Sequence, residues 1–233
     1  MDSPMSVEDY RRWKDLDYTP ASRDVVPASL AGRVHAGQRA LDVGCHHGAA
    51  SFFMASIGLR VLGIDINPQA VEVARRRPLG SLGPWPEFVV ADFLADRFAE
   101  PTSFDIVVLN RFLTCLPALP DWQSGLERAR ELLIDGGILY VNDFLLMPAC
   151  DHNRSRYVQG YARAGRWGNF AVLDEQDQAS FVAHHHSAQE LRRIAAPYRL
   201  ACLRRYSTRS RNGYPSRMFE LIGVLKPCPL RIG

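Results

Sequence analysis

The 233-residue sequence predicts a doubly wound α/β fold, in which helices cover both faces of a mostly parallel β-sheet. Short apolar runs alternate with amphipathic segments through the first 143 residues, as expected of parallel strands joined by helical crossovers. The run from Phe104 to Leu109 is apolar at five of its six positions, which is typical of a strand covered on both faces. Two late apolar runs flank Asn212-Gly213, so the sequence also predicts a C-terminal antiparallel hairpin.

The first part of the chain is expected to supply five strands and three connecting helices. The strands are predicted over residues 40–43, 59–64, 88–91, 104–109 and 138–141. The helices are predicted over residues 49–57, 68–77 and 121–133. Asn67 is the expected N-cap of the second helix, and Gly136-Gly137 is the expected stop of the third.

The regular alternation ends after Asp143. Residues 147–180 show no clear period, so we expect an inserted segment with some helix near residues 154–161. Ser187 is predicted to cap a helix over residues 188–196, because Glu190 completes a capping box. The late hairpin is expected to pair residues 200–206 with 218–225.

On this basis the chain is expected to be one domain with four parts. These are an N-terminal helical cap (1–37), a core (38–143), an inserted lid or substrate-facing segment (144–186), and a C-terminal helix and hairpin (187–233). Within the first part, residues 10–18 are expected to form a short amphipathic helix.

The composition is that of an ordinary globular chain, with 47% hydrophobic and 23% charged residues, which excludes disordered and fibrous classes. Five scattered cysteines without a Cys-x-x-Cys pair, and a polar N-terminus without an apolar signal core, predict a reducing, cytoplasmic location. No apolar run approaches the roughly 20 residues that cross a bilayer, so no membrane partner is expected.

The net charge of +3 is unevenly placed. Residues 187–233 hold ten Lys/Arg and two Glu, which gives +8 there and −5 in the rest of the chain. Two interpretations stay open at this point: a solvated basic face, or an anionic partner such as an acidic small molecule or a nucleic acid.

Two glycines after the first predicted strand indicate a ligand site. Glycine lets the backbone of Gly44-Cys45-His46-His47-Gly48 approach a ligand closely, ahead of a helix N-terminus that favours an anionic group. A dinucleotide fingerprint would need a glycine at position 46, and the histidine there argues against NAD or FAD. Asp65 lies 21 positions after Gly44, where a ribose diol would be hydrogen-bonded.

Five segments in this order resemble the motifs of class I S-adenosylmethionine-dependent methyltransferases. They are Leu41-Asp42-Val43-Gly44-Cys45-x-x-Gly48, Gly63-Ile64-Asp65-Ile66-Asn67, Ala91-Asp92-Phe93, Phe104-Asp105-Ile106-Val107 and Leu132-Leu133-x-x-Gly136-Gly137. The resemblance covers residues 38–143 and favours the small-molecule type over the nucleic-acid type. It implies a seven-stranded Rossmann-like sheet, an enzyme, and S-adenosylmethionine as the cofactor.

The resemblance also implies which residues bind the cofactor: Asp42, Gly44, Cys45, His46, Gly48, Asp65, Ile66, Asp92, Phe93 and Asn110. Those before Asp65 would cradle the methionine end, and Asp65 would hold both ribose hydroxyls. Ile66, Asp92 and Phe93 would contact the adenine, and Asn110 would lie near the sulfonium.

Methyl transfer is an in-line displacement, so holding the acceptor in line supplies much of the catalysis, and a base is needed only for some acceptors. Three histidines, 184–186, follow the insert, but neighbours in an extended chain face opposite sides and no second ligand cluster accompanies them. We therefore expect no metal. Small-molecule members of the family carry an aromatic residue or histidine before a Ser-capped helix here, which makes His185 and His186 the candidate catalytic residues.

Arginine and aromatic side chains are the candidates for binding the acceptor: Arg111, Tyr157, Tyr161 and Arg166. Guanidinium groups bind carboxylates and stack on flat rings, so we expect a small aromatic or acid-bearing acceptor, with the acceptor atom (O, N or C) left open.

Two alternatives to this function remain. The basic C-terminal part is compatible with a tRNA or other RNA methyltransferase. Because His46 replaces the usual glycine, the chain is also compatible with a cofactor-binding protein of this fold that transfers no methyl group or does other chemistry. The sequence predicts no oligomeric state.

Overall fold

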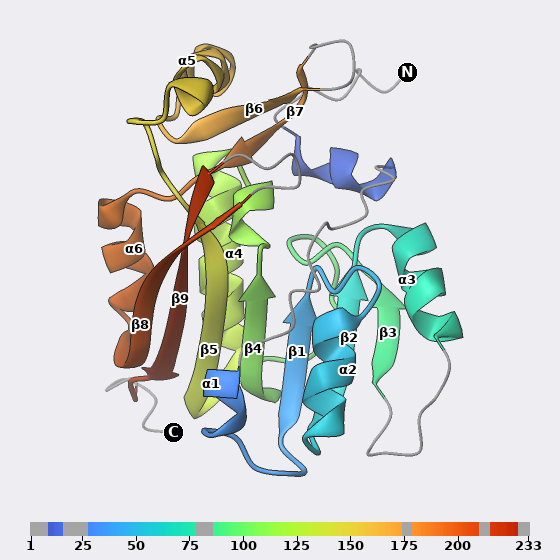
Figure 1. The fold of residues 1–233 in the computed structure, drawn as a ribbon. Coiled ribbons are helices and arrows are strands. Elements are labelled where there is room, and N and C mark those ends of the chain that lie inside the picture. The colour runs from blue at the N-terminus through green and yellow to red at the C-terminus, as the bar shows by residue number, and fades with distance from the viewer. Residues whose placement is uncertain (1–8, 16–27, 78–85, 174–178, 210–214, 228–233) are drawn as a thin grey trace.

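Figure 1 shows a computed structural model of the chain, which describes residues 9–15, 28–77, 86–173, 179–209 and 215–227. The strands are β1 (Arg39–Val43), β2 (Arg60–Asp65), β3 (Glu87–Val90), β4 (Phe104–Asn110), β5 (Leu133–Leu145), β6 (Asn169–Leu173), β7 (Ala179–His184), β8 (Tyr198–Arg209) and β9 (Pro215–Leu225). The helices are η1 (Tyr10–Asp15), α1 (Ala28–Ala31), α2 (Ala49–Ser56), α3 (Pro68–Arg76), η2 (Leu113–Cys115), α4 (Leu119–Leu132), α5 (Asp151–Ala164) and α6 (Ala188–Ala195).

Seven of the strands form one sheet in the order β3-β2-β1-β4-β5-β9-β8. Pairing is parallel from β3 through β5 and antiparallel where β9 lies between β5 and β8. The predicted fold class, a doubly wound and mostly parallel sheet of seven strands with a C-terminal antiparallel hairpin, is therefore confirmed.

Two apolar clusters hold the helices against the sheet, one on each face. One packs α4 and α6 through residues such as Trp122 and Ile194, and the other packs α1 and α2 through Leu30 and Met54. Residues 106–109 of β4 are completely buried between the two clusters, as expected of a strand covered on both faces. The parallel strands consequently open toward ligand only at their carboxyl ends.

Of the local signals at three helix ends, two are confirmed and one is corrected. Asn67 caps α3 by accepting hydrogen bonds from the backbone of Gln69 and Ala70, and Ser187 forms a complete capping box with Glu190. The expected glycine stop is wrong: α4 ends at Leu132, and β5 begins at the next residue and runs through both glycines. The register with β4 shifts in this stretch, where Gly136 adopts φ 75°, so the glycines belong to an irregular strand start.

The inserted segment is more regular than its aperiodic sequence indicates. It contains α5, which includes the expected helix near 154–161, and a two-stranded antiparallel sheet of β6 and β7 that the sequence did not predict. Helix α5 packs closely on β6 at Gly160, where a Cβ atom would collide with the backbone of Asn169. This hairpin is therefore set by packing between elements, which has no short-range periodicity.

The inserted sheet and η1 lie above the carboxyl ends of the central strands (Figure 1). Trp13 of η1 packs edge-on against Phe181 of β7, with ring centroids 4.6 Å apart. Only residues 10–15 of the expected N-terminal helix form η1, and residues 16–18 lie outside the described residues. No helix of the described residues is long and apolar enough to cross a membrane.

Candidate active site

The loop after β1 makes its turn with three residues at positive φ. Gly44 has φ 68°, His46 has φ 49° and Gly48 has φ 77°. Histidine is one of the few non-glycine residues that adopts this region with any frequency. His46 therefore adopts a left-handed backbone conformation that glycine takes more readily, and the loop completes its turn with it.

Close neighbours explain the two flanking glycines. A Cβ atom at Gly48 would lie 2.6 Å from the Phe88 ring, and one at Gly44 would lie 3.0 Å from the Phe112 ring. Glycine at these positions leaves room for the two phenylalanine rings, which pack against the loop. We call residues 44–48, the turn between β1 and α2, the cradle.

Asp65, at the end of β2, ties this cradle to the next strand. One carboxylate oxygen accepts a hydrogen bond from the His46 backbone N–H at 2.8 Å, and the other accepts one from the Asn67 N–H at 2.8 Å. Each carboxylate oxygen has a further lone pair, so Asp65 can still accept hydrogen bonds from two hydroxyl groups. These two free acceptor positions fit the two ribose hydroxyls of an adenosyl group.

Asp42 lies beneath the cradle and is 2% exposed. The Ser51 hydroxyl of α2 donates a 2.5 Å hydrogen bond to its carboxylate. Burial raises the pKa of Asp42 to about 7, and the nearby charge of Asp65 acts in the same direction, although the Ser51 hydrogen bond opposes them. Cys45 of the same loop is also buried. The hydrogen bond between Asp42 and Ser51 thus ties β1 to α2, the two elements that the loop connects.

The residues expected at the adenine lie around the end of β3. Asp92 accepts a 2.7 Å hydrogen bond from the Tyr10 hydroxyl of η1, so the N-terminal cap reaches this edge of the core. Burial first and Asp92 second raise the pKa of Tyr10. Ile66 is half-buried, whereas Phe93 is 4% exposed and meets the edge of the Phe112 ring at 5.3 Å.

Two polar side chains expected near the sulfonium or the acceptor, Asn110 and Arg111, lie where β4 ends. Asn110 pairs with Asn142 across the sheet. The guanidinium of Arg111 lies 3.8 Å from the Met218 sulfur and 5.4 Å from the Phe144 ring centroid.

Asp143 of β5 was missed by sequence reasoning. It is completely buried and accepts hydrogen bonds from the backbone N–H groups of Thr114 and Phe144. Burial raises its pKa to about 7, against those hydrogen bonds and the charge of Arg111. The sequence signal for Asp143 is that an acidic residue follows an apolar run, near the carboxyl edge of the predicted sheet.

His185 lies between two aromatic rings. It stacks on Phe144 with centroids 5.2 Å apart and on Phe170 with centroids 4.6 Å apart. Its Nδ1 is 2.7 Å from the Tyr157 hydroxyl, which also accepts the Met147 backbone N–H at 3.1 Å. Desolvation, with smaller effects of His184 and Arg156, lowers the pKa of His185 to about 3, so the ring is neutral near pH 7.

These contacts determine which ring nitrogen of His185 carries the proton. Tyr157 is completely buried, and among the described residues His185 Nδ1 is the only acceptor for its hydroxyl hydrogen. Nδ1 must then present its lone pair, and the neutral ring carries its proton on Nε2. His185 in this state offers a hydrogen-bond donor instead of the basic nitrogen that we expected from the sequence.

The His186 side chain lies on the opposite side of the backbone from that of His185, and it is completely buried. Its Nε2 accepts a 3.0 Å hydrogen bond from the indole N–H of Trp122, so its Nδ1–H donates to the Phe144 carbonyl at 3.1 Å. Burial lowers the pKa of His186 well below its usual range. Both ring nitrogens are occupied, which leaves neither for a proton of the acceptor.

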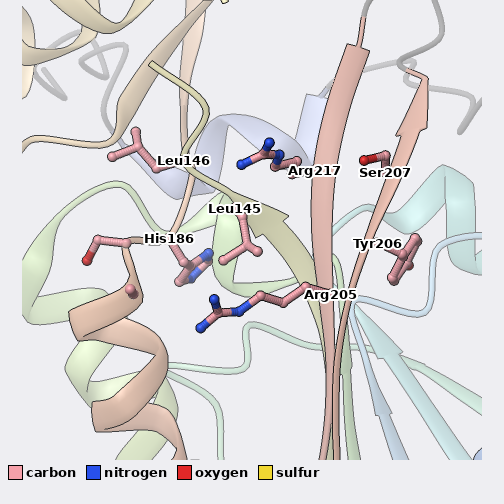
Figure 2. Close-up of a pocket in the computed structure, with 9 residues that line it drawn as sticks. Leu145, Leu146, His186, Arg205, Tyr206, Ser207 and Arg217 are labelled. Carbon is pink, nitrogen blue, oxygen red and sulfur yellow. The ribbon is translucent and has the colours of Figure 1, made fainter. Parts of the chain in front are cut away.

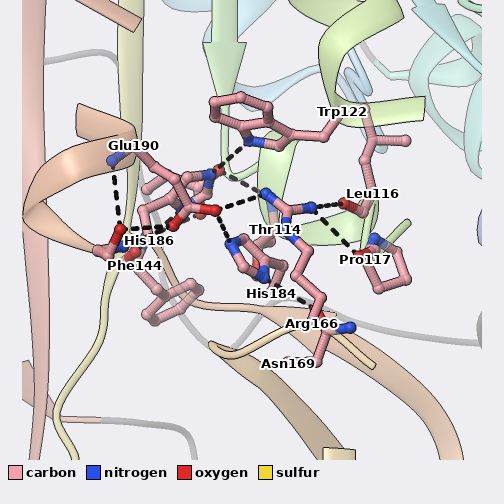
Figure 3. Close-up of polar contacts among 12 residues, drawn as sticks. Thr114, Leu116, Pro117, Trp122, Phe144, Arg166, Asn169, His184, His186 and Glu190 are labelled. Atoms are coloured by element: carbon pink, nitrogen blue, oxygen red, sulfur yellow. Dashed lines mark hydrogen bonds and ion pairs between the residues drawn. The ribbon is translucent and has the colours of Figure 1, made fainter. Parts of the chain in front are cut away.

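Arg166 joins the insert to the core (Figure 3). Its guanidinium donates to Glu190 at 2.7 Å and to the carbonyls of Leu116 and Pro117. His184 bonds the same Glu190 at 3.1 Å, and these partners lower the pKa of Glu190 strongly although burial opposes them. Arg166, expected from the sequence to bind the acceptor, thus has internal partners for its guanidinium.

The last candidate, Tyr161 of α5, lies apart from this network. It is 51% exposed and meets the exposed Trp167 ring edge-on at 6.3 Å. Tyr157 therefore contacts His185, whereas Tyr161 contacts Trp167.

Residues 41–139 match a family model described as a methyltransferase domain. The chain is 34% identical over 154 residues to the ubiquinone biosynthesis O-methyltransferase of Xanthomonas campestris pv. campestris, covering 59% of this chain and 58% of that protein. It therefore spans less than two thirds of the curated relatives it matches.

Solved structures share the fold over most of the chain. A SAM-dependent methyltransferase from Methanosarcina mazei aligns with TM-score 0.81 and 25% identity, over 87% of this chain and 99% of that chain. The 1,6-didemethyltoxoflavin-N1-methyltransferase of Burkholderia thailandensis, solved with bound 1,6-didemethyltoxoflavin and S-adenosylhomocysteine, aligns with TM-score 0.63 and 17% identity, over 97% of this chain and 94% of that chain.

Proposed function

We propose that this chain, which belongs to the class I S-adenosylmethionine-dependent methyltransferases, methylates an anionic oxygen of a small aromatic or acid-bearing molecule. The naming of its curated relatives as O-methyltransferases supports oxygen as the acceptor atom. The basic C-terminal part, +8 over residues 187–233, supports an acceptor with negative charge.

The residues of the β1 loop and the β2 end fit the cofactor. The cradle of Gly44–Gly48 accommodates the methionine end, and the remaining lone pairs of Asp65 accept the ribose hydroxyls. Asp92, which accepts a hydrogen bond from Tyr10, would contact the edge of the adenine. Bound S-adenosylmethionine supplies an electrophilic methyl group, which an already anionic oxygen can attack without losing a proton.

The observation that carries the acceptor class is the position of His185 between two aromatic rings. Phe144 and Phe170 fix the plane of the His185 ring, and Arg111 lies over Phe144 with a permanent positive charge. The Nε2–H of His185 is a donor for an acceptor oxygen, held in that tautomer by Tyr157. An anionic oxygen needs such a donor and a cation for positioning, and it needs no general base.

This role predicts an order among substitutions at position 185. Glutamine can donate a hydrogen bond but cannot act as a base, whereas glutamate can act as a base but cannot donate when ionised. We expect His185→Gln to retain more turnover than His185→Glu. The reverse order would show that His185 removes a proton.

The proposal is tested in two steps. Calorimetry with S-adenosylhomocysteine measures cofactor binding, and failure to bind at millimolar concentration would remove the assignment altogether. Mass spectrometry then follows methyl transfer to a panel of phenols, aromatic carboxylates and aromatic amines. We expect products from the carboxylates and from phenols acidic enough to be ionised at the assay pH, and products from amines alone would contradict oxygen transfer.

We also propose that the protein works in a reducing compartment, the cytoplasm. Cys45, Cys115, Cys150 and Cys202 are all free thiols, which is typical of intracellular proteins.

A further inference from the structure

A pocket of about 370 Å³ lies between the end of β5, the start of α6 and the β8–β9 hairpin (Figure 2). Leu145 and Leu146 supply an apolar wall, and Ser187 and Ala188 supply the first residues of α6. Arg205 of β8 and Arg217 of β9 point toward this wall in Figure 2. None of these residues belongs to the cofactor cradle.

The strand register explains why the two arginines share the pocket. Arg217 pairs with Leu145 on one side and with Ser207 on the other, and Arg205 pairs with Phe219. Positions 205 and 217 are therefore diagonal neighbours on one face of the hairpin, at a spacing of about 7 Å that long side chains bridge.

Two positive charges so placed repel each other. Within the described residues, neither guanidinium has a hydrogen-bond or ion-pair partner. Glu190, the acidic residue in the first turn of α6, is paired with Arg166 and His184. Arg204, by contrast, points to the other face and is paired with Glu220. The pocket thus holds positive charge that the protein itself does not balance.

We propose that this pocket binds a small acid, with a carboxylate or phosphate between Arg205 and Arg217 and an apolar body against Leu145 and Leu146. Paired guanidinium groups are the usual protein partner of such oxyanions, because their N–H groups match the oxygen geometry. An oxyanion here also cancels the repulsion between the two arginines. The inference does not depend on methyl transfer, because binding is measured without turnover.

Phenyl phosphate, benzoate and inorganic phosphate are the probes, titrated into the full chain by calorimetry. The test variant is Arg205→Gln with Arg217→Gln. The matched control is Arg60→Gln with Arg199→Gln, which removes the same charge at two exposed strand positions outside the pocket. We expect phenyl phosphate or benzoate to bind about tenfold or more weakly to the test variant, and within about twofold of wild type to the control.

Three outcomes would overturn the proposal. They are no binding of either aromatic acid to the wild type at millimolar concentration, equal weakening in test and control variants, and equal affinity for inorganic phosphate, which would remove the role of the apolar wall. S-adenosylhomocysteine is titrated into the same preparations. Its unchanged binding separates failure of this pocket from failure of the proposed function.

Discussion

At the scale of single residues, Asp65 connects the β1 loop to the start of α3, because its carboxylate accepts hydrogen bonds from the backbone of both. Asp65→Ala should weaken S-adenosylhomocysteine binding by about 1–3 kcal/mol, since the ribose hydroxyls and two N–H groups lose their acceptor. Calorimetry measures this, with Glu72→Ala as the control, because the half-exposed Glu72 side chain on α3 pairs with Arg76 away from Asp65. An unchanged affinity for the Asp65 variant would mean that other residues hold the ribose.

We expect the adjacent residues His185 and His186 to have different roles. His185→Ala should lower turnover about tenfold or more and leave cofactor affinity intact, because it removes a donor to the acceptor. The exposed His35→Ala is the control for both measurements. Wild-type turnover in the His185 variant would exclude a role for this side chain in the reaction.

His186→Ala should instead lower the free energy of unfolding by about 1–3 kcal/mol, since it leaves the Trp122 indole N–H unpaired in the core, while the Phe144 carbonyl keeps its bond from the backbone N–H of residue 186. Urea denaturation measures this loss. A variant as stable as wild type would contradict the structural role of His186.

At the scale of elements, the sequence predicted what short-range chemistry controls. Asn67 and Ser187 were identifiable as caps because their side chains bond the backbone two or three residues away. The β6–β7 hairpin was not, because its pairing depends on the packing of α5 through Gly160. In the site, the motif residues 42–65 lie together as expected, whereas the tautomer of His185 depends on Tyr157, 28 positions away.

The insert is expected to depend on Arg166 for its attachment. Arg166→Met leaves the buried Glu190 carboxylate with fewer donors and should lower the free energy of unfolding by about 3 kcal/mol. The exposed Arg163→Met on α5 should change it by less than about 0.5 kcal/mol. Thermal and urea unfolding of both variants measure the difference, and equal effects would show that the attachment lies elsewhere.

At the scale of the whole molecule, buried acids make stability depend on pH. The pKa of Asp42 is about 7 in the folded protein and about 4 when unfolded, so the folded state holds a proton that the unfolded state releases. Its contribution is therefore fully present below about pH 4 and falls as the pH rises to the folded pKa near 7, and the last part of about 1 kcal/mol is lost between pH 6 and pH 8. Asn at this position does not titrate.

Relative to wild type, Asp42→Asn should consequently gain about 1 kcal/mol of stability between pH 6 and pH 8. Urea denaturation of both proteins at the two pH values measures this gain. A constant difference would place the pKa of Asp42 outside this interval.

The N-terminal element η1 has contacts on two sides of the molecule: Tyr10 bonds Asp92 of the core, and Trp13 packs on Phe181 of the inserted hairpin. These contacts must separate whenever η1 moves away from the strand ends. A ligand that enters over these strand ends by displacing η1 would have to break both contacts, so a six-residue helix links the core and the inserted hairpin to ligand entry.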